Sequence, residues 1–393
     1  MTAAQKQVEL AGCFVDKVGT TLRLQFSTAP TTLYILYIYP IYMGERQSGP
    51  MTSLFLDTLS GQNSAPPPIW LMRQAGRYLE EYRKVRASEP DFISFCLNPD
   101  KAIEVTLQPI DRFGFDAAII FSDILMVPWA LDRNVRFITG EGPKLDPMEQ
   151  GDEITESAVA TMASRLENVG QAISGCRAAL ARDKALIGFA GAPWTIITYL
   201  LEGGSSRDFA IARRWMWENE TRFDHLLSLV SDATVEFLDL QARAGADVLM
   251  LFDSWASAVP AHLRKKVVID PVNHIVGALR ARGHRQPVIG FPKGIGEGLV
   301  AYCNETDIDG VGLDHGVDIR WASSALPDHL TLQGNLDPLS LIAGGASMHR
   351  AIDEILEAMA TRRHIFNLGH GITPETPVAH VHEMLARVRG TGG

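Results

Sequence analysis

From residue 69 onward, short apolar runs alternate with long amphipathic stretches, and this alternation restricts the fold more than any other feature of the chain. Runs rich in Ile, Val, Leu and Phe are typical of strands in a buried parallel sheet, and amphipathic stretches are typical of the helices that cover it. Eight runs occur, at residues 69–73, 117–122, 185–191, 247–253, 287–293, 310–315, 330–335 and 364–370. They predict a single α/β domain with the (β/α)8 architecture of a TIM barrel.

Local signals agree with this pattern. Three pairs join a capping residue to a proline at the first helical position, and they are Asn98-Pro99, Asp337-Pro338 and Thr376-Pro377. We expect the helix from Pro377 to close the barrel. Turn-forming residues between 132 and 150 predict a hairpin or excursion between the second and third units.

Residues 1–50 differ in character from the remainder. Their longest apolar run, at 33–43, is interrupted by Pro40 and is shorter than the roughly 20 residues that span a bilayer. It also lies too far from the N-terminus, with too weak a basic flank, for a signal peptide. We interpret 1–50 as an N-terminal extension, either a lineage-specific addition or the product of an upstream start assignment, and 51–393 as the barrel domain.

The formal charge of −10 argues against a general nucleic-acid or membrane-surface binder, because both need a basic surface. A local arginine cluster still permits an anionic substrate, since charges are screened over about 8 Å. Four cysteines, at 13, 96, 176 and 303, form no CxxC pair and no Cys-x-His spacing. We therefore expect reduced thiols in a cytoplasmic protein and no metal site.

The densest basic patch of the chain lies at residues 73–86. Arg73 ends the first apolar run and Arg77 follows four residues later, at what we interpret as the entry of a helix. Guanidinium groups pair with carboxylates through two parallel hydrogen bonds, and residues four apart share a helix face, so both arginines are expected to bind one anionic ligand. Arg83 and Lys84 fit a solvated helix face, paired with nearby glutamates.

Barrel enzymes build their sites at the carboxyl ends of the strands, so the polar residues that end each run are the candidates. They are Arg73, Ser122 with Asp123, Trp194 and Tyr199, Asp253 with Ser254, Lys293, Asp314 with His315, Gln333 with Asn335, and Asn367 with His370. Donors outnumber acceptors if Asp253 and Asp314 are occupied structurally. An alternative for Lys293 is a Schiff-base lysine.

These motifs also resemble one family. MRQAGRY, FSDIL, GFAGAPWTIITYLLEGG, FDSWA, GFPKG, GLDHG, QGNLDP and NLGHGITPETP occur in this order and are similar to uroporphyrinogen decarboxylase, from about Phe55 to Arg389. The resemblance implies conversion of the four acetates of uroporphyrinogen III to methyl groups, giving coproporphyrinogen III and four CO2 in haem and porphyrin synthesis. It implies no metal or organic cofactor, and usually a homodimer.

The resemblance also assigns roles to residues. Asp123 matches the aspartate that accepts hydrogen bonds from the pyrrole NH groups and faces the developing positive charge. The residues that match substrate-binding positions are Arg73, Gln74, Ala75, Arg77, Arg86, Tyr199, Phe252, Ser254 and His370. Among these, Phe252 is expected to pack on the macrocycle, and Gln74 and Ala75 to offer backbone NH groups. The proton donor stays open among Arg73, Tyr199 and a bound water.

Two other functions compete with this interpretation. A cobamide-dependent methyltransferase has a similar barrel but binds zinc through His and Cys ligands, and this chain lacks the His-x-Cys pair. A non-catalytic tetrapyrrole-binding protein with the same fold would bind the porphyrinogen without releasing CO2.

Overall fold

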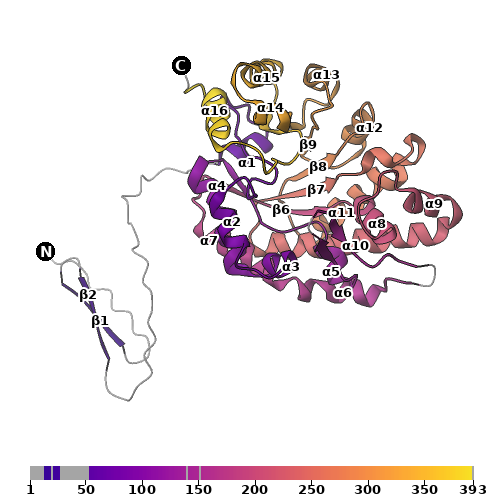
Figure 1. Cartoon of the computed structure of the whole chain (residues 1–393), viewed down its shortest axis with the longest axis horizontal. Helices are drawn as coiled ribbons and strands as arrows, with labels where there is room; N and C mark the ends of the chain where they lie inside the picture. The colour runs from indigo at the N-terminus through magenta and orange to yellow at the C-terminus, as the bar shows by residue number, and fades with distance from the viewer. Residues whose placement is uncertain (1–12, 19–20, 27–52, 139, 150–151, 392–393) are drawn as a thin grey trace. The chain divides into compact units, whose positions relative to one another are not determined.

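A computed structural model of the chain describes residues 13–18, 21–26, 53–138, 140–149 and 152–391 (Figure 1). The chain divides into two compact units, Met1–Pro50 and Met51–Gly393. In the first unit, β1 (Cys13–Val18) and β2 (Thr21–Phe26) pair as an antiparallel hairpin. The rest of the predicted N-terminal extension lies outside the described residues.

The second unit contains a parallel sheet of seven strands, whose spatial order β11-β10-β9-β8-β7-β6-β3 follows the chain order. Its strands are β3 (Ala117–Ile119), β6 (Ala185–Gly191), β7 (Val248–Asp253), β8 (Val288–Pro292), β9 (Gly310–Gly312), β10 (Thr331–Leu336) and β11 (His364–Leu368). Almost every strand residue is buried, as expected for a sheet covered on both faces. Seven of the eight predicted strands are therefore confirmed.

The first predicted run, 69–73, does not form a strand. Ile69 makes a single parallel bridge with Phe366 of β11. On the β11 side, Phe366 N donates to Pro68 O (2.9 Å) and Trp70 N donates to Phe366 O (3.3 Å), and on the β3 side Asp116 N donates to Ile69 O (2.9 Å). The segment thus lies between β11 and β3, but a turn that begins at Met72 ends it.

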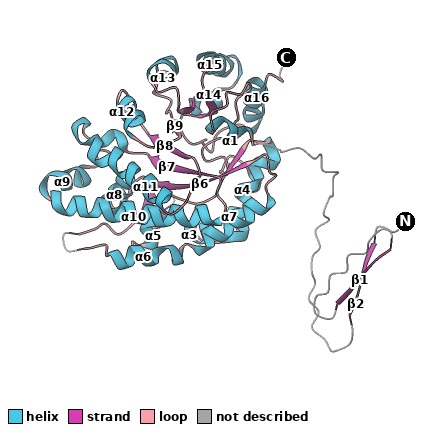
Figure 2. Ribbon diagram, turned by 180° about the vertical axis from the view of Figure 1, so that it is seen from behind, coloured by secondary structure: helices cyan, strands magenta, loops and turns pink. Residues whose placement is uncertain are grey.

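The helices lie on the outside of the sheet (Figure 2). They are α1 (Leu54–Leu59), α2 (Glu80–Arg86), α3 (Phe92–Cys96), α4 (Pro99–Phe113), α5 (Met126–Ala130), α6 (Glu156–Arg165), α7 (Glu167–Ala179), α8 (Pro193–Glu202), α9 (Ala210–Glu218), α10 (Glu220–Ala244), α11 (Asp270–Ala281), α12 (Gly298–Glu305), α13 (Ile319–Ala325), α14 (Pro338–Ala343), α15 (Gly345–Ala358) and α16 (Val378–Arg389). Two 3-10 turns (Ala256–Ala258 and Ala261–Leu263) and a π-helix (Lys265–Ile269) precede α11. Within the described residues, no helix combines the length and apolarity needed to cross a bilayer.

Two of the three predicted caps are confirmed. The side chain of Asn98 accepts from Lys101 N at the start of α4, and that of Asp337 accepts from Leu339 N at the start of α14. The third is wrong by one position, because Pro377 rather than Thr376 is the N-cap of α16. The Thr376 hydroxyl forms a hydrogen bond with the Thr373 hydroxyl instead. The predicted hairpin is present as antiparallel β4 (Arg136–Ile138) and β5 (Gly142–Lys144).

At the amino ends of the strands, three aspartates repeat one arrangement. Each directly precedes a strand, accepts a backbone NH from the neighbouring strand position, and pairs with an arginine of a helix. The sets are Asp116 with Ile69 N (2.9 Å) and Arg389, Asp247 with Leu186 N (2.8 Å) and Arg177, and Asp309 with Val288 N (2.8 Å) and Arg280. Ile69 N therefore donates the same kind of hydrogen bond as Leu186 N in β6 and Val288 N in β8, although the segment of Ile69 forms no strand.

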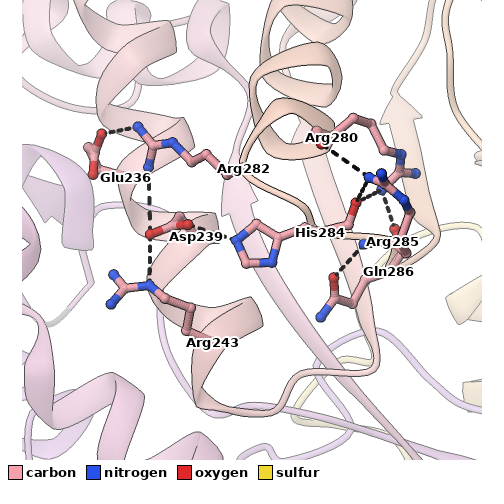
Figure 3. Close-up of polar contacts among 8 residues, drawn as sticks. All are labelled: Glu236, Asp239, Arg243, Arg280, Arg282, His284, Arg285 and Gln286. Atoms are coloured by element: carbon pink, nitrogen blue, oxygen red, sulfur yellow. Dashed lines mark hydrogen bonds and ion pairs between the residues drawn. The ribbon is translucent and has the colours of Figure 1, made fainter.

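A second polar network joins α10 to the segment between α11 and β8 (Figure 3). Asp239 accepts from His284 Nε2 (2.7 Å) and from Arg243 Nε (2.9 Å), and Arg282 pairs with Glu236. Each of these charged groups has a partner inside the network, so the network fixes the turn that leads into β8. The chemistry is expected at the opposite ends of the strands.

Candidate active site

Two buried amide side chains hold the segment that carries Arg73. Gln74 Oε1 accepts from Leu71 N (3.1 Å) while Gln74 Nε2 donates to Ala117 O (3.1 Å). Asn367, at the end of β11, accepts from Met72 N (3.0 Å). These amides satisfy backbone groups that a strand would have satisfied through its ladder. Gln333 adds a third amide, which accepts from Trp70 Nε1 (2.8 Å).

Arg73 itself adopts a left-handed backbone conformation, with φ of 61°. A non-glycine residue in this region costs about 1–3 kcal/mol and persists only where its surroundings hold it. Gly76 allows the turn, because a Cβ there would lie 2.9 Å from Arg73 O. The side chain of Arg73 then passes close to the backbone of Gly371, beyond β11.

Arg73 and Arg77 do not lie on one face of a helix. Residues 72–79 form turns and α2 begins only at Glu80, so this prediction is wrong. The left-handed residue and Gly76 interrupt any helical path. Both arginine side chains are exposed, and neither makes an ion pair or hydrogen bond with another described residue. Each guanidinium therefore remains available to an anionic ligand.

Asp123 follows β3 and is partly buried. One carboxylate oxygen, Oδ1, accepts from Leu125 N (2.8 Å). Burial raises the pKa of Asp123, while the Leu125 NH and the positive charge of Arg73 oppose the rise. The carboxylate thus lies within electrostatic range of Arg73, and its second oxygen has no donor among the described residues.

Tyr199 of α8 belongs to the same neighbourhood. Burial raises its pKa, the Trp255 side chain opposes the rise, the negative charge of Asp123 adds to it, and Arg73 and Ser205 oppose it. The phenol therefore stays protonated near neutral pH and can donate a hydrogen bond. The Trp255 indole NH is buried and makes no hydrogen bond of normal geometry.

His370 follows β11 and is partly buried. Burial, together with the positive charges of Arg73, Lys293 and His315, lowers its pKa to about 4, whereas Asp314 opposes them. The imidazole is neutral at pH 7 and so offers one donor and one acceptor. His370 therefore lies within electrostatic range both of Arg73 and of Lys293, which follows β8.

Phe252 and Ser254 lie at the end of β7, where both are partly exposed. The Phe252 ring makes edge contacts with Phe189 (5.5 Å between centroids) and Phe291 (6.0 Å) on the neighbouring strands. Phe189 and Phe291 are buried and Phe252 is the partly exposed member of this cluster, which suits the packing role predicted for Phe252. The Ser254 hydroxyl makes no hydrogen bond to the described part of the chain.

Asp253 is the last residue of β7, where it is buried and accepts a hydrogen bond from α8. Thr195 Oγ1 donates to Asp253 Oδ1 (2.6 Å) and accepts from Trp255 N (3.2 Å). Burial raises the pKa of Asp253 to about 7, while the bonds from Thr195 and Trp255 oppose the rise. This carboxyl therefore serves the turn that presents Ser254.

Asp314 is occupied as well. Its two oxygens accept from Gly294 N (2.8 Å) and Gly316 N (2.9 Å). Asp253 and Asp314 both accept hydrogen bonds from protein donors, so both carboxylates are occupied structurally, as the predicted excess of donors requires. Among the acidic candidates at the strand ends, Asp123 and Asp253 each keep an oxygen with no hydrogen-bond donor in the described residues, and of these two carboxyl groups only that of Asp123 is partly exposed.

The remaining candidates are placed less directly. Gln74 N donates to Leu71 O (3.0 Å), so of the two predicted NH groups only that of Ala75 has no partner within the described residues. Arg86 donates to Glu89 O (3.0 Å) and lies over the Phe95 ring. No contact in the described residues joins Arg86 to Asp123.

Sequence reasoning missed three neighbours of Tyr199 and Ser254. Trp255 follows Ser254 in FDSWA, and its position just after a predicted strand end could have identified it. Thr195 and Ser205 carry no local signal, because they reach the site only through the path of α8 and the loop after it.

Two surface pockets lie away from these residues. One is lined by Trp217, Phe223 and Leu263, and the other by Leu227, Ser231 and His274. Both involve α10 and the segment before α11, and neither contains a strand-end candidate. The described residues also hold no cluster of three or more His, Cys, Asp or Glu arranged for a metal ion.

Fold and site together define an α/β protein with unpaired basic side chains at the carboxyl ends of a parallel sheet. Residues 51–391 match the uroporphyrinogen decarboxylase (URO-D) family, and the chain belongs to this family. It is 50% identical over 334 residues to the uroporphyrinogen decarboxylase of Maricaulis maris, with 85% of this chain and 96% of the relative covered. The enzyme of that name from Sphingopyxis alaskensis is 48% identical, with 85% and 97% covered.

The uroporphyrinogen decarboxylase of Caulobacter vibrioides is also 48% identical, covering 86% of this chain and 96% of the relative. These relatives carry the name of a carboxy-lyase, which confirms the predicted family and enzyme class. Among solved structures, a methyltransferase from Methanosarcina mazei superposes with a TM-score of 0.73 at 17% identity, covering 87% of this chain and all of that one. At this identity the likeness concerns the fold alone.

Proposed function

We propose that the protein decarboxylates the four acetate side chains of uroporphyrinogen III to methyl groups, giving coproporphyrinogen III and four CO2. Family membership and relatives at 45–50% identity support the reaction. One observation carries the assignment to this site. Asp123 keeps a carboxylate oxygen without a protein donor, within range of Arg73, which has no ion-pair partner in the described residues.

In each step, a proton adds to the ring carbon next to the carbon that bears the acetate, which gives a cationic ring. The bond to the carboxylate then breaks, CO2 leaves, and the bonding electrons neutralise the cation as an exocyclic methylene forms. A second proton converts the methylene to methyl, and the ring carbon releases the first proton. Each acetate therefore consumes one proton and releases one CO2.

Asp123 accepts hydrogen bonds from the pyrrole NH groups in this proposal. Burial raises the pKa of Asp123, because its negative charge is poorly hydrated. A cationic ring beside the carboxylate compensates this charge, so it is stabilised more than a neutral ring. The carboxylate is thus matched to the transition state rather than to the neutral substrate.

The substrate carboxylates are assigned to the donors around Asp123. Arg73 and Arg77 bind them through unpaired guanidinium groups, and Ala75 N, Ser254, Tyr199 and His370 add hydrogen bonds. Phe252 packs on the macrocycle. Gln74 acts by holding the Arg73 segment, and Arg86 acts at the edge of the site. The proton donor remains one of Arg73, Tyr199 or a bound water.

The proposal includes three further points, which are the closed barrel from the count of apolar runs, the cytoplasmic location from the cysteine pattern and the homodimer from the family resemblance. Residues 68–70 complete a (β/α)8 barrel between β11 and β3, supported by hydrogen bonds on both sides. The protein is a cytoplasmic homodimer. Sedimentation equilibrium of the purified chain tests the dimer, and a monomer at micromolar concentration would contradict it.

The function is tested by anaerobic incubation with enzymatically generated uroporphyrinogen III. We expect hepta-, hexa-, penta- and tetracarboxylate products in succession, separated by chromatography after oxidation to porphyrins. A folded protein that binds the porphyrinogen without forming products would be a carrier and would overturn the proposal. Stoichiometric zinc in the purified protein would instead favour the methyltransferase alternative.

A further inference from the structure

Lys293 differs from the other unpaired basic side chains in the described part of residues 53–391. In this described part of the chain, the arginines and lysines that make neither an ion pair nor a hydrogen bond are Arg73, Arg77, Arg182, Arg207, Arg213, Lys293 and Arg350. All except Lys293 are exposed. A partly buried ammonium group without a partner is costly, because burial removes hydration without replacing it.

The position of Lys293 is well determined. It directly follows β8, and its backbone N donates to Asp253 O (3.0 Å) and Phe291 O (3.1 Å). The next residue, Gly294, donates to Asp314 Oδ2 (2.8 Å). These bonds hold the turn, so Lys293 is presented from a rigid strand end rather than from a mobile loop.

No neighbouring carboxylate neutralises the ammonium group. Asp253 is committed to Thr195, and Asp314 to two backbone NH groups. Lys293 Nζ lies instead 5.8 Å from the centroid of the Trp255 ring, a cation–π contact. An aromatic face orients the cation and leaves its hydrogen-bond donors free for an anion.

Lys293 also belongs to the same site as Arg73, since the positive charges of both residues lower the pKa of His370. The substrate in the proposed function carries carboxylates on all four rings, so Arg73 and Arg77 leave other carboxylates to bind. Trp255, against which Lys293 lies, also neighbours Tyr199.

We propose that Lys293 is a further substrate-binding residue, whose ammonium group binds a carboxylate of the tetrapyrrole at the end of β8, over the Trp255 ring. This inference rests on the proposed function, because it takes its ligand from it. The role is electrostatic, so an arginine at this position retains it. A Schiff base, by contrast, requires the amine of lysine.

The test compares Lys293→Met, which keeps the length of the stem, with Lys293→Arg and with the control Arg350→Met. Arg350 is likewise unpaired but lies exposed on α15. We expect Lys293→Met to raise KM for uroporphyrinogen roughly tenfold with kcat changed by less than about threefold, the signature of lost ground-state binding. Lys293→Arg is expected to restore most of the affinity, and Arg350→Met to match the wild type.

Thermal unfolding shows whether each variant is folded. An unchanged KM in folded Lys293→Met, or a KM in Lys293→Arg as high as in Lys293→Met, overturns the inference while leaving the proposed function intact. A wild type that forms no product overturns the proposed function, and titration with fluorescent uroporphyrin then decides the inference. Weaker binding by Lys293→Met than by Arg350→Met supports it, and equal binding rejects it.

Discussion

The side chain of Arg73 passes so close to Gly371 that a Cβ on the glycine would lie 2.5 Å from Arg73 Cδ and 3.0 Å from Nε. Carbon atoms in good contact are about 3.5–4.0 Å apart. Gly371 thus provides the space through which an arginine from the first apolar run reaches the site. The two residues come from the first and last strand positions of the predicted barrel.

Replacement of Gly371 by alanine is therefore expected to displace Arg73. We expect kcat/KM to fall at least tenfold, since a displaced catalytic or binding group commonly costs that much or more. The free energy of unfolding should change by only about 1–3 kcal/mol, because the exposed end of the arginine can move aside. Steady-state decarboxylation and urea unfolding measure the two effects.

Gly277 of α11 provides the matched control, because a Cβ there would meet nothing within 4 Å. Gly277→Ala is expected to leave activity unchanged and to stabilise the helix by roughly 0.5–1 kcal/mol. Equal activities in the two alanine variants would show that Gly371 does not position Arg73.

Asp123→Asn tests the central carboxylate. The amide oxygen still accepts from Leu125 N, so the turn is preserved while the negative charge is lost. Charge-assisted hydrogen bonds contribute about 1.5–3 kcal/mol each, so loss of two is expected to lower kcat/KM roughly 100-fold or more. Turnover close to that of the wild type in a folded variant would remove Asp123 from its proposed role.

Asp253 predicts a stability that decreases as pH rises. Burial raises its pKa from about 3.8 to about 7, so between these values the folded protein keeps a proton that the unfolded chain releases. The free energy of unfolding therefore falls across this window, by up to roughly 4 kcal/mol, and this loss is complete above pH 7.

In Asp253→Asn, the amide oxygen still accepts from Thr195 and the titration is absent. We expect the variant to gain stability relative to the wild type between pH 4 and pH 7, measured by urea unfolding followed through tryptophan fluorescence. Parallel pH dependence in the two proteins would mean that Asp253 is ionised throughout.

For His370, the free energy of unfolding changes with pH in the opposite direction. Its pKa is lowered from 6.5 to about 4, so the unfolded chain binds the proton first as pH falls. The stability from the neutral imidazole is fully present above pH 6.5 and is lost as pH falls toward 4. Nitrogen-15 NMR of histidine-labelled protein, with His370→Gln for assignment, should show a neutral ring at pH 6. A midpoint near 6.5 would contradict the burial and charges that surround it.

The support of the Arg73 segment is tested by Asn367→Ala. This change removes the acceptor for Met72 N (3.0 Å) and Leu368 N (2.7 Å) in a site that excludes water. We expect a loss of about 2–4 kcal/mol in the free energy of unfolding, together with lower activity, because Arg73 follows Met72. Asn304→Ala, at an exposed helical position, should change stability by no more than about 0.5 kcal/mol.

Much of the fold was predictable because it depends on local patterns. A strand buried on both faces needs a continuous apolar run, and seven such runs became strands with shifted ends. Two caps were predictable because Asn98 and Asp337 act within three residues of their own positions. The same logic placed polar candidates at the strand ends, where a run must stop.

The rest depended on groups far apart in the chain. Asn367 accepts from Met72 N across 295 residues of sequence and Gln74 accepts from Leu71 N, so these backbone NH groups bind side chains rather than a strand ladder. The next residue, Arg73, is left-handed and α2 begins only at Glu80, so the expected helix face with Arg77 does not form.

By itself, the sequence determined which residue types stand at the ends of the apolar runs, and hence the prediction that Arg73 lies near Asp123. The structure places these two residues within electrostatic range of each other. Only the tertiary structure decided which of those groups are free. Asp253 and Asp314 are committed to Thr195 and to backbone NH groups, whereas Lys293 has no counter-charge within the described residues. Pairing is a property of distance in space, and periodicity along a chain does not encode it.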